Sequence, residues 1–399
     1  MLRIELRTRV DTLQPADNAL VPLVFDGLVR AGEHGEPLPS LAVSWRTEGD
    51  SRRWQFRIRP GVRFHDGTPL TASAAAASLE ALGASAQGDS VVIVCERPSP
   101  QFPLQLVRGR TAIARRTPGG AVVGTGPFRV TQFEPGQRAV LTANDDYWRG
   151  RPFLDGIRVE MGRATRDQLL DLELDRADIV ELGPAEVRRA SQGGRRVWTS
   201  QPVELMALRL NVEDSLVRET LALSIDRAAI HGVLLQKQGA PAASLLPQWL
   251  SGYAFLFNPV RRRTPVSGSS PIGLYVDTSD PLATAVASRI AVNAREAGIV
   301  IRIQPAAAGA SASLVRVRMA SLDPLEALPE IGAALGLAPF ARPLNLEELY
   351  RAERTVLDDH RVVPLFHLPD SAGLSAHVRN WQPLPWGGWP LDNVWLAAR

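Results

Sequence analysis

The pattern of apolar and polar positions indicates a strand at the start of the chain and a hairpin further along it. Residues 2–6 alternate between aliphatic and charged side chains, which is the period of two expected for a half-buried strand. Residues 128–133 have a strand-like spacing of apolar side chains, a Pro135-Gly136 turn follows, and residues 139–141 begin an apolar return. We therefore predict a strand at the start of the chain and a β-hairpin further along it.

The second half of the chain combines helical and strand patterns. Between residues 217 and 229 an apolar residue recurs every four positions, which predicts a helix with one apolar stripe. Residues 272–276 and 299–303 are strand-like and flank a helical pattern over 281–297, a spacing typical of a βαβ unit with parallel strands. Residues 346–357 are amphipathic and predict another helix. The chain is therefore predicted to be a mixed α/β protein.

Length, apolar runs and cysteine content add three expectations. The chain has 399 residues, which is more than one hydrophobic core usually serves, so two lobes are expected. No stretch of 18 or more apolar residues occurs, so no membrane-spanning helix is predicted. Cys95 is the only cysteine and cannot form an internal disulfide. Its apolar neighbours favour a buried, inert thiol.

The sequence pI of about 9.5 does not by itself predict nucleic-acid binding. The formal net charge is only +3, because 45 basic residues are interspersed with 42 acidic ones. Lys237 is the only lysine, so the composition shows a preference for arginine rather than a basic patch. The densest basic cluster, residues 261–263, lies in a segment rich in Pro and Ser and predicts a solvated loop. We expect no nucleic-acid partner.

Four short motifs follow one another between residues 122 and 161. They are Gly-Thr-Gly-Pro-Phe (124–128), Pro-Gly (135–136), Asn-Asp-Asp-Tyr-Trp (144–148) and Arg-Pro-Phe-Leu-Asp (151–155). In this order they resemble the extracellular solute-binding proteins, family 5, of bacterial ABC importers for peptides, dipeptides and nickel. The run Gly-Val-Arg-Phe-His-Asp-Gly-Thr-Pro-Leu-Thr at 61–71 resembles a second signature of the same family.

The resemblance implies a two-lobe α/β fold like that of the periplasmic binding proteins (type II), with the ligand in the inter-lobe cleft. Lobe 1 is expected to comprise residues 1–205 and 361–399, and lobe 2 residues 206–360. Only 57 positions separate Gly67 from Gly124, an interval in which peptide-binding members carry an extra subdomain. We therefore expect the insertion subdomain of the first lobe to be reduced.

The function implied by the resemblance is that of a substrate-binding protein. Such a protein captures a small solute, peptide-like or another organic ligand, anionic ones included, and delivers it to a membrane permease. The expected partners are the ligand and the permease subunits, and the protein is expected to be a periplasmic or extracellular monomer whose secretion signal has been removed. The alternative is the ligand-sensing domain of a cytoplasmic or signalling protein with the same fold.

Enzyme chemistry and cofactors are not expected. The sequence has no Gly-x-Ser-x-Gly elbow, no His-Glu-x-x-His and no Cys-x-x-Cys motif. His65 and Asp66 stand side by side, but adjacent residues do not share a face of a strand, and no third ligand is spaced to join them. We interpret this pair as part of a loop, and we expect neither a catalytic residue nor a metal site.

The candidate ligand-binding residues lie in both predicted lobes. They are Leu13, Asn18, Trp386 and Trp389 in lobe 1, and Arg209, Asn211 and Asp323 in lobe 2. Both tryptophans belong to a tryptophan-rich tail, for which packing is the more common role.

One position departs from the pattern of peptide-binding relatives. The resemblance implies that these relatives bind the α-ammonium group of the ligand with an Asp that lies three residues before an Asp-Pro pair. Alignment on Asp323-Pro324 places Ala320 there. Alanine can neither accept a hydrogen bond through its side chain nor balance a charge. We therefore predict that the usual ammonium clamp is missing, unless Asp323 itself takes that role.

Arg209 is a second departure, at a position where the family usually has a small or apolar residue. Residues 206, 208 and 210 share the expected core face of a strand over 205–211, and Arg209 and Asn211 share the other face. Arg209 would present its planar fork to a ligand carboxylate or phosphate, with Asn211 adding a neutral hydrogen bond. The alternative is an ion pair with Glu204 or Glu213.

Overall fold

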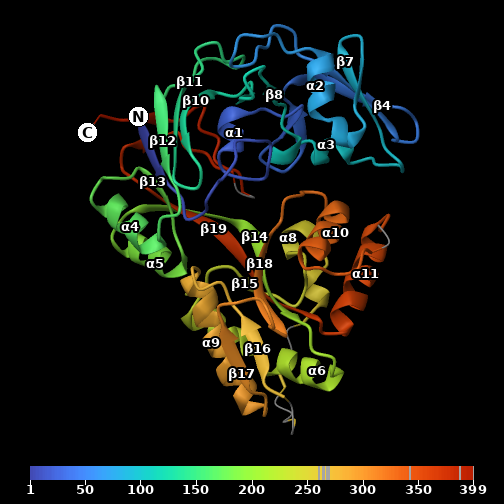
Figure 1. The fold of residues 1–399 in the computed structure, drawn as a ribbon, viewed down its shortest axis with the longest axis vertical. Helices are drawn as coiled ribbons and strands as arrows, with labels where there is room; N and C mark the ends of the chain where they lie inside the picture. The colour runs from blue at the N-terminus through green and yellow to red at the C-terminus, as the bar shows by residue number, and fades with distance from the viewer. Residues whose placement is uncertain (259–260, 263–265, 267–269, 341–342, 386–387, 399) are drawn as a thin grey trace. The chain divides into compact units, whose positions relative to one another are not determined.

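The computed structural model describes residues 1–258, 261–262, 266, 270–340, 343–385 and 388–398. The chain forms two compact units, shown by their labelled elements in Figure 1. Unit 1 comprises Met1–Leu182, Ala190–Trp198 and Ala372–Arg399, and unit 2 comprises Gly183–Arg189 and Thr199–Ser371. Each unit has its own hydrophobic cores, so each is described by itself.

The larger sheet of unit 1 contains the predicted first strand and hairpin. Its strands, in order, are β10 (Phe128–Glu134), β11 (Arg138–Ala143), β12 (Gly156–Glu160), β1 (Leu2–Glu5), β13 (Ile179–Glu181) and the end of β19 (Val362–Leu374). β10 and β11 are antiparallel, and Gly136 in their turn has a φ of 66°, which is readily adopted only by glycine. β1 lies between β12 and β13 and is parallel to both. The hairpin and the first strand are thus confirmed.

A smaller antiparallel sheet draws two of its four strands from the interval predicted to be reduced. Its strand order is β4 (Ala42–Thr47), β5 (Arg53–Ile58), β7 (Ser90–Val94) and β6 (Ser85–Gln87). Helix α2 (Ala72–Ser78) packs beside it, and the Thr71 hydroxyl caps that helix by accepting from the Ala74 N–H at 3.1 Å. The interval between Gly67 and Gly124 therefore supplies the β7–β6 edge of this sheet and helix α2 beside it.

Cys95 is partly rather than fully buried, and it packs against the core cluster of the smaller sheet. The thiol follows the last residue of β7, and its side chain is only half-buried. The preceding residue, Val94, is 58% exposed. The apolar run therefore reaches the surface at its end, where the strand leaves the core.

Unit 2 is built on a sheet in which β14 (Arg196–Leu210) pairs with β18 (Ala312–Arg318). β18 is followed in the sheet by β16 (Ile272–Tyr275) and β17 (Ile301–Gln304), and the first part of β19 lies on the other side of β14. Helix α9 (Pro281–Glu296) connects β16 to β17, which pair in parallel, so the predicted βαβ unit is confirmed (Figure 1).

Both faces of β14 are buried over much of its length within unit 2. Met206, Leu208 and Leu210 belong to one core cluster, together with residues of α9 and of α6 (Ser215–Ser224). Leu205 and Ala207, on the opposite face, belong to a second cluster with α10 (Pro324–Ala334) and α11 (Leu346–Asp358). The predicted core face is confirmed, but the face that carries Arg209 also packs against helices.

The apolar stripe predicted over 217–229 spans two helices rather than one. α6 ends at Ser224, and α7 (Arg227–Val233) begins after Asp226, whose carboxylate accepts from the Ala229 N–H at 2.9 Å. Arg227 donates to the Pro364 carbonyl at 2.9 and 3.0 Å. The helix cap at Asp226 interrupts the stripe and starts a new helix direction.

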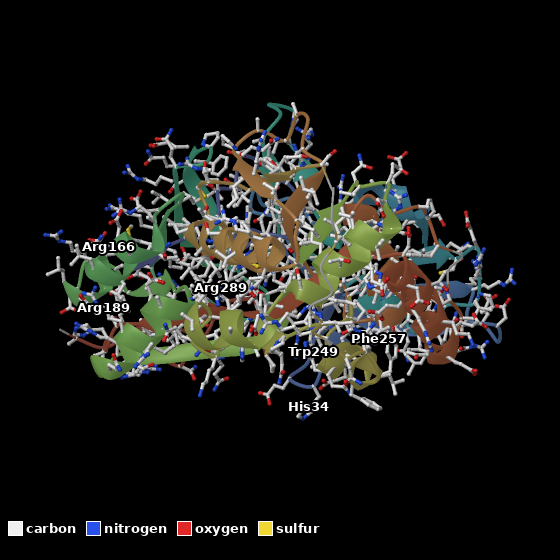
Figure 2. The ribbon with its side chains drawn as sticks, turned by 90° about the horizontal axis from the view of Figure 1, so that it is seen from below. His34, Arg166, Arg189, Trp249, Phe257 and Arg289 are labelled. Carbon is white, nitrogen blue, oxygen red and sulfur yellow. The ribbon has the colours of Figure 1, made fainter. Side chains whose placement is uncertain are left out.

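The segment over 248–257 contains two short helices, α8 (Gln248–Ser251) and η3 (Ala254–Leu256). The indole N–H of Trp249 donates to the Pro202 carbonyl at 2.7 Å, and Phe257 contacts the ring of Tyr350 at 5.3 Å between centroids. Figure 2 labels both residues on this segment. These contacts fix it to the rest of unit 2.

Two strands belong to both units. β14 changes from unit 1 to unit 2 after Trp198, and β19 returns to unit 1 after Ser371. The resemblance placed these changes at 205/206 and 360/361. Because β14 and β19 continue through both cores, the unit boundaries fall inside the strands.

The remaining elements are short or peripheral. They are α1 (Val21–Val24), β2 (Val29–Ala31), β3 (Pro37–Pro39), η1 (Glu80–Leu82), α3 (Phe102–Gln105), η2 (Gly109–Thr111), β8 (Arg115–Arg116), β9 (Val122–Val123), α4 (Thr165–Glu173), α5 (Pro184–Gln192), β15 (Ala240–Pro241), β20 (Val378–Arg379) and β21 (Trp395–Leu396). None of the helices in the described ranges combines the length and the apolar character needed to cross a membrane.

Candidate functional site

The family-like motifs of unit 1 converge on one carboxylate, Asp26. Its oxygens accept hydrogen bonds from the Thr125 hydroxyl (2.9 Å), the Tyr147 hydroxyl (3.1 Å) and the Trp148 indole N–H (2.9 Å). Burial raises the pKa of Asp26, and the three hydrogen bonds oppose that rise. The motifs at 124–128 and 144–148 are therefore held together through Asp26.

Two further features explain the residue types in these motifs. A Cβ on Gly124 would lie 2.0 Å from the Val24 carbonyl oxygen, and a Cβ on Gly126 would lie 2.5 Å from the Val24 carbonyl carbon, so only glycine fits at either position. The Asn144 side chain donates to the Gly126 carbonyl at 3.1 Å and accepts from Arg129 at 2.6 Å. The motifs thus serve packing within unit 1.

The loop at 63–67 lines a pocket in unit 1 together with Arg129, Asn144 and Asp146. The imidazole of His65 bonds to the Gly126 carbonyl at 3.0 Å, and burial lowers its pKa. Asp66 instead pairs with Arg115. In the described part of the chain, no three His, Cys, Asp or Glu side chains lie close enough to hold a metal ion. His65 and Asp66 therefore bind different groups of the protein.

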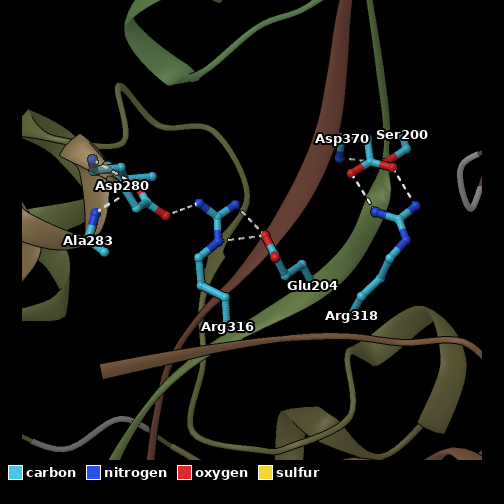
Figure 3. Close-up of polar contacts among 8 residues, drawn as sticks. Ser200, Glu204, Asp280, Ala283, Arg316, Arg318 and Asp370 are labelled. Atoms are coloured by element: carbon cyan, nitrogen blue, oxygen red, sulfur yellow. Dashed lines mark hydrogen bonds and ion pairs between the residues drawn. The ribbon is translucent and has the colours of Figure 1, made fainter. Parts of the chain in front are cut away.

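Unit 2 contains a network of charged side chains that the sequence analysis did not single out (Figure 3). Arg316 donates from Nε to Glu204 at 2.8 Å and from Nη1 to Asp280 at 2.6 Å. The other oxygen of Asp280 caps α9, accepting from the backbone N–H groups of residues 282 and 283 at 3.0 and 3.1 Å. Burial lowers the pKa of Arg316, but the two carboxylates raise it by more. Arg316 is therefore a structural cation.

Arg318, two residues further along β18, forms a different kind of pair. Its Nη1 and Nη2 atoms donate to the two oxygens of Asp370 at 2.8 and 2.5 Å (Figure 3). The two side chains are 45% and 33% exposed. The backbone N–H of Asp370 donates to the Ser200 hydroxyl at 2.9 Å. The available sequence signal was a pair of arginines at alternate positions of a strand, Arg316 and Arg318.

Arg209 lies at the C-terminal end of helix α10. A Cβ on Gly336, the residue after the C-cap Leu335, would be 3.2 Å from Nη1 of Arg209. A positive charge there interacts favourably with the helix dipole. The acids named as its alternative partners bind other arginines, since Glu204 pairs with Arg316 and Glu213 approaches Arg361 at 3.6 Å.

Asp323 lies at the opposite end of the same helix. Its carboxylate accepts from the Leu325 N–H at 3.0 Å and so caps α10, and burial raises its pKa. An α-helix rises 1.5 Å per residue, so the ends of this helix, and with them Asp323 and Arg209, are roughly 16 Å apart. Asn211 is exposed, and its backbone N–H donates to the Ser311 carbonyl at 2.8 Å. The candidates of unit 2 therefore do not form one cluster.

Two of the candidate ligand-binding residues of unit 1 pack against its hydrophobic core. Leu13 and Trp389 both contact the same core cluster, and Trp389 also meets Trp381 edge to face at 6.1 Å. The side-chain amide oxygen (Oδ1) of Asn18 accepts from the backbone N–H groups of residues 20 and 21 at 3.0 and 3.3 Å. Trp386 lies outside the described residues.

Comparison with known proteins places these features in a family. The profile of the bacterial extracellular solute-binding proteins, family 5 (middle region), matches residues 36–314, well over half of the chain. The chain belongs to this family. Its named relatives are binding proteins for peptides and nickel rather than enzymes.

Three individual likenesses illustrate the match. The uncharacterized protein YhjP of Bacillus subtilis (strain 168) is 30% identical over 160 residues, which cover 36% of this chain and 28% of that protein. AgaA of A. tumefaciens R10, solved with agropinic acid, superposes with a TM-score of 0.81 at 17% identity. The match covers 100% of this chain and 99% of the AgaA chain. A dipeptide-binding protein of Pseudoalteromonas sp. SM9913, solved with Met-Leu, has a TM-score of 0.84 at 15% identity, with 99% of this chain and all of that chain covered.

The structural likenesses show a type II periplasmic-binding-protein fold, as predicted. The matched stretch spans 28%, 48% and 47% of the length of three curated relatives, so this chain spans at most about half of each.

Proposed function

We propose that this protein is the substrate-binding component of an ABC importer, which captures a small organic solute and delivers it to a membrane permease. The observation that carries the proposal is the family match over residues 36–314. The type II fold, with its two units and two shared strands, supports it. The proposed location is periplasmic or extracellular, and the proposed working form is a monomer that contacts the permease subunits.

The proposed ligand is not anchored through an α-ammonium group at the position of Ala320. This residue lies two positions after the end of β18, and its side chain offers no acceptor. Asp323, the alternative acceptor, already uses its carboxylate to cap α10. Both observations support a solute other than an unmodified peptide recognised by its amino end.

Arg209 and Asn211 remain proposed contacts for an anionic part of the ligand. The position of Arg209 beside Gly336 supports a structural contribution to the end of α10 as well. An Arg209→Ala protein that stays folded and loses its solute would support the ligand contact. Unchanged affinity in that variant would assign Arg209 to helix stabilisation alone, and isothermal titration with the identified solute separates the two.

The experiment that tests the proposed function is native mass spectrometry of the protein purified from its host. We expect a small molecule to remain bound with one molecule per chain, and its removal to lower the melting temperature. Absence of any retained molecule, together with no thermal shift from peptides, metal chelates, sugars or opines, would contradict the proposal.

A further inference from the structure

The pocket of unit 1 has a volume of about 250 Å³ and is lined by three segments of the chain. They are the loop at 63–67, strand β10 at Arg129, and the segment after β11 at Asn144 and Asp146. All of these residues belong to unit 1. The pocket is therefore a feature of that unit alone.

Two walls of the pocket share one anchor in the turn at 124–128. The backbone N–H of His65 donates to the Gly124 carbonyl at 2.8 Å, and its imidazole bonds to the Gly126 carbonyl at 3.0 Å. Asn144 is only 3% exposed, and its amide nitrogen donates to the same Gly126 carbonyl at 3.1 Å. The loop at 63–67 and the segment after β11 are thus fixed relative to each other.

Two guanidinium groups line the pocket, and neutral acceptors hold both of them. Arg129 donates from Nε and Nη2 to the side-chain oxygen of Asn144 at 3.1 and 2.6 Å. Arg63 donates from Nη1 to the Gly67 carbonyl at 2.8 Å. Among the residues that the structure describes, Nη1 of Arg129 and the Nε and Nη2 atoms of Arg63 have no acceptor. Both cations are therefore positioned while part of each donor set stays available.

The two acids that line the pocket do not balance both of these cations. Asp66 accepts from the backbone N–H and the hydroxyl of Thr68 at 3.0 and 2.6 Å, and it pairs with Arg115. Asp146 is 81% exposed and approaches Nη2 of Arg129 only at 3.6 Å. An exposed pair of this kind contributes little. At least one of the two guanidinium groups is therefore left without a counter-charge.

We infer that this pocket is a binding site additional to the proposed solute site, and that it takes a small oxyanion, a phosphate or a carboxylate, through Arg63 and Arg129. The two groups come from a loop and a strand, so they address separate oxygens of one anion. Because bonds within the protein already hold them, less entropy is lost on binding. A volume of about 250 Å³ suits a small anion rather than a peptide.

Isothermal titration of the full chain at constant ionic strength tests the site, because constant ionic strength keeps the screening of charges the same for every probe. The probes are inorganic phosphate, acetate and citrate, with chloride as the reference anion. We expect saturable binding of at least one probe over chloride. Binding of phosphate alone would assign a phosphate site, and binding of acetate or citrate alone would assign a carboxylate site.

Two variants remove the proposed contacts. Arg63→Ala and Arg129→Ala should each weaken the binding roughly tenfold, because each removes a charge-assisted hydrogen bond. Arg63 is exposed, so its replacement leaves the fold intact even if the loss of Arg129 disturbs Asn144. Asp146→Asn should strengthen the binding by up to about fivefold, because it removes the acid nearest to Arg129.

Arg46→Ala is the matched control. Like Arg129, Arg46 is a strand residue of unit 1 that donates from Nε and Nη2 to one side-chain amide oxygen, that of Gln55, at 2.9 and 2.7 Å. It lies in β4 and does not line the pocket. Its replacement removes the same charge from the protein, and the affinity for the anion should equal that of the wild-type protein.

Three results would overturn the inference. They are equal affinity of the anion for wild type and Arg63→Ala, equal weakening in Arg46→Ala and Arg129→Ala, and a titration in which no probe binds more tightly than chloride. The second result would assign the binding to net charge rather than to the pocket. None of these results touches the proposed solute capture, which native mass spectrometry tests separately.

Discussion

Glu353 in α11 is a buried acid that organises a neighbouring segment. Its carboxylate accepts from the backbone N–H of Leu245, from that of Leu246 at 3.3 Å and from the Tyr253 hydroxyl at 2.7 Å. Burial raises its pKa to about 7, although the three hydrogen bonds oppose the rise. At the scale of single residues, such groups decide how the stability of unit 2 depends on pH.

We predict that Glu353 makes the protein less stable as pH rises. Its pKa is about 7 in the folded state and about 4.5 in the unfolded chain, so the folded state binds the proton more tightly. Stability is therefore full below about pH 4.5, falls up to pH 7 and then levels off, a loss of about 3 kcal/mol from this group. Glu353→Gln should remove most of this loss and be the more stable protein at pH 8.

Urea unfolding between pH 5 and 8 measures how the free energy of unfolding of the wild-type protein and of Glu353→Gln changes with pH. Glu5, whose pKa burial raises to about 7, adds a loss of stability with pH in both proteins, and His367, whose pKa burial lowers to about 4, adds a gain in both, so the difference between the two slopes reports Glu353. Identical slopes for wild type and Glu353→Gln would show that Glu353 is not the group responsible.

A second prediction at this scale concerns Asp26. Its replacement by alanine leaves three buried or half-buried donors, on Thr125, Tyr147 and Trp148, without their acceptor. We expect a loss of at least about 2 kcal/mol of unfolding free energy, measured by chemical denaturation. Asp146→Ala, a change of an acid that is 81% exposed in the same motif, should stay within about 0.5 kcal/mol. Equal losses in both variants would refute the central place of Asp26.

The motifs around Asp26 can be recognised in the sequence, but the hydrogen bonds that join them to Asp26 cannot. The donors lie 99, 121 and 122 residues from Asp26 along the chain, so no local pattern joins them. The same limit hid Arg318, whose partner Asp370 is 52 residues away.

At the scale of elements, local sequence signals predicted the helices and strands well wherever caps and turns decide the structure. The β10–β11 turn and the βαβ unit with α9 follow from Gly, Pro and the period of apolar residues. The break between α6 and α7 was missed because the apolar stripe continues past it, although Asp226 carried a usable cap signal. The two buried faces of β14 were missed because Arg209 suggested an open face.

For α10 we predict that Asp323 acts as a helix cap. Asp323→Ala should lower the unfolding free energy by about 1 kcal/mol, because the Leu325 N–H loses its acceptor, and Asp323→Asn should largely restore it. Thermal denaturation measures the first effect, and titration with the identified solute measures binding. Strong loss of binding in Asp323→Asn, despite normal stability, would instead make Asp323 the ligand's ammonium acceptor.

At the scale of the whole molecule, the resemblance predicted the family and fold, whereas the boundaries of the units were harder to place. β14 has 15 residues and β19 has 13, and each contributes to cores of both units. Their apolar pattern continues through the change of unit, so nothing in the sequence marks it. The ligand is harder still to predict, because the motifs at 124–128 and 144–148 that carry the sequence resemblance make contacts within unit 1.

The central claim, that this chain is a solute-binding protein, is tested most directly by isothermal titration with the solute recovered from its host. The account predicts one site per chain, and a stabilisation against unfolding of about 2.7 kcal/mol at a free solute concentration of 100 times Kd. Saturable heat with that stabilisation would support it. Absence of binding heat and an unchanged unfolding free energy at saturating solute would contradict it.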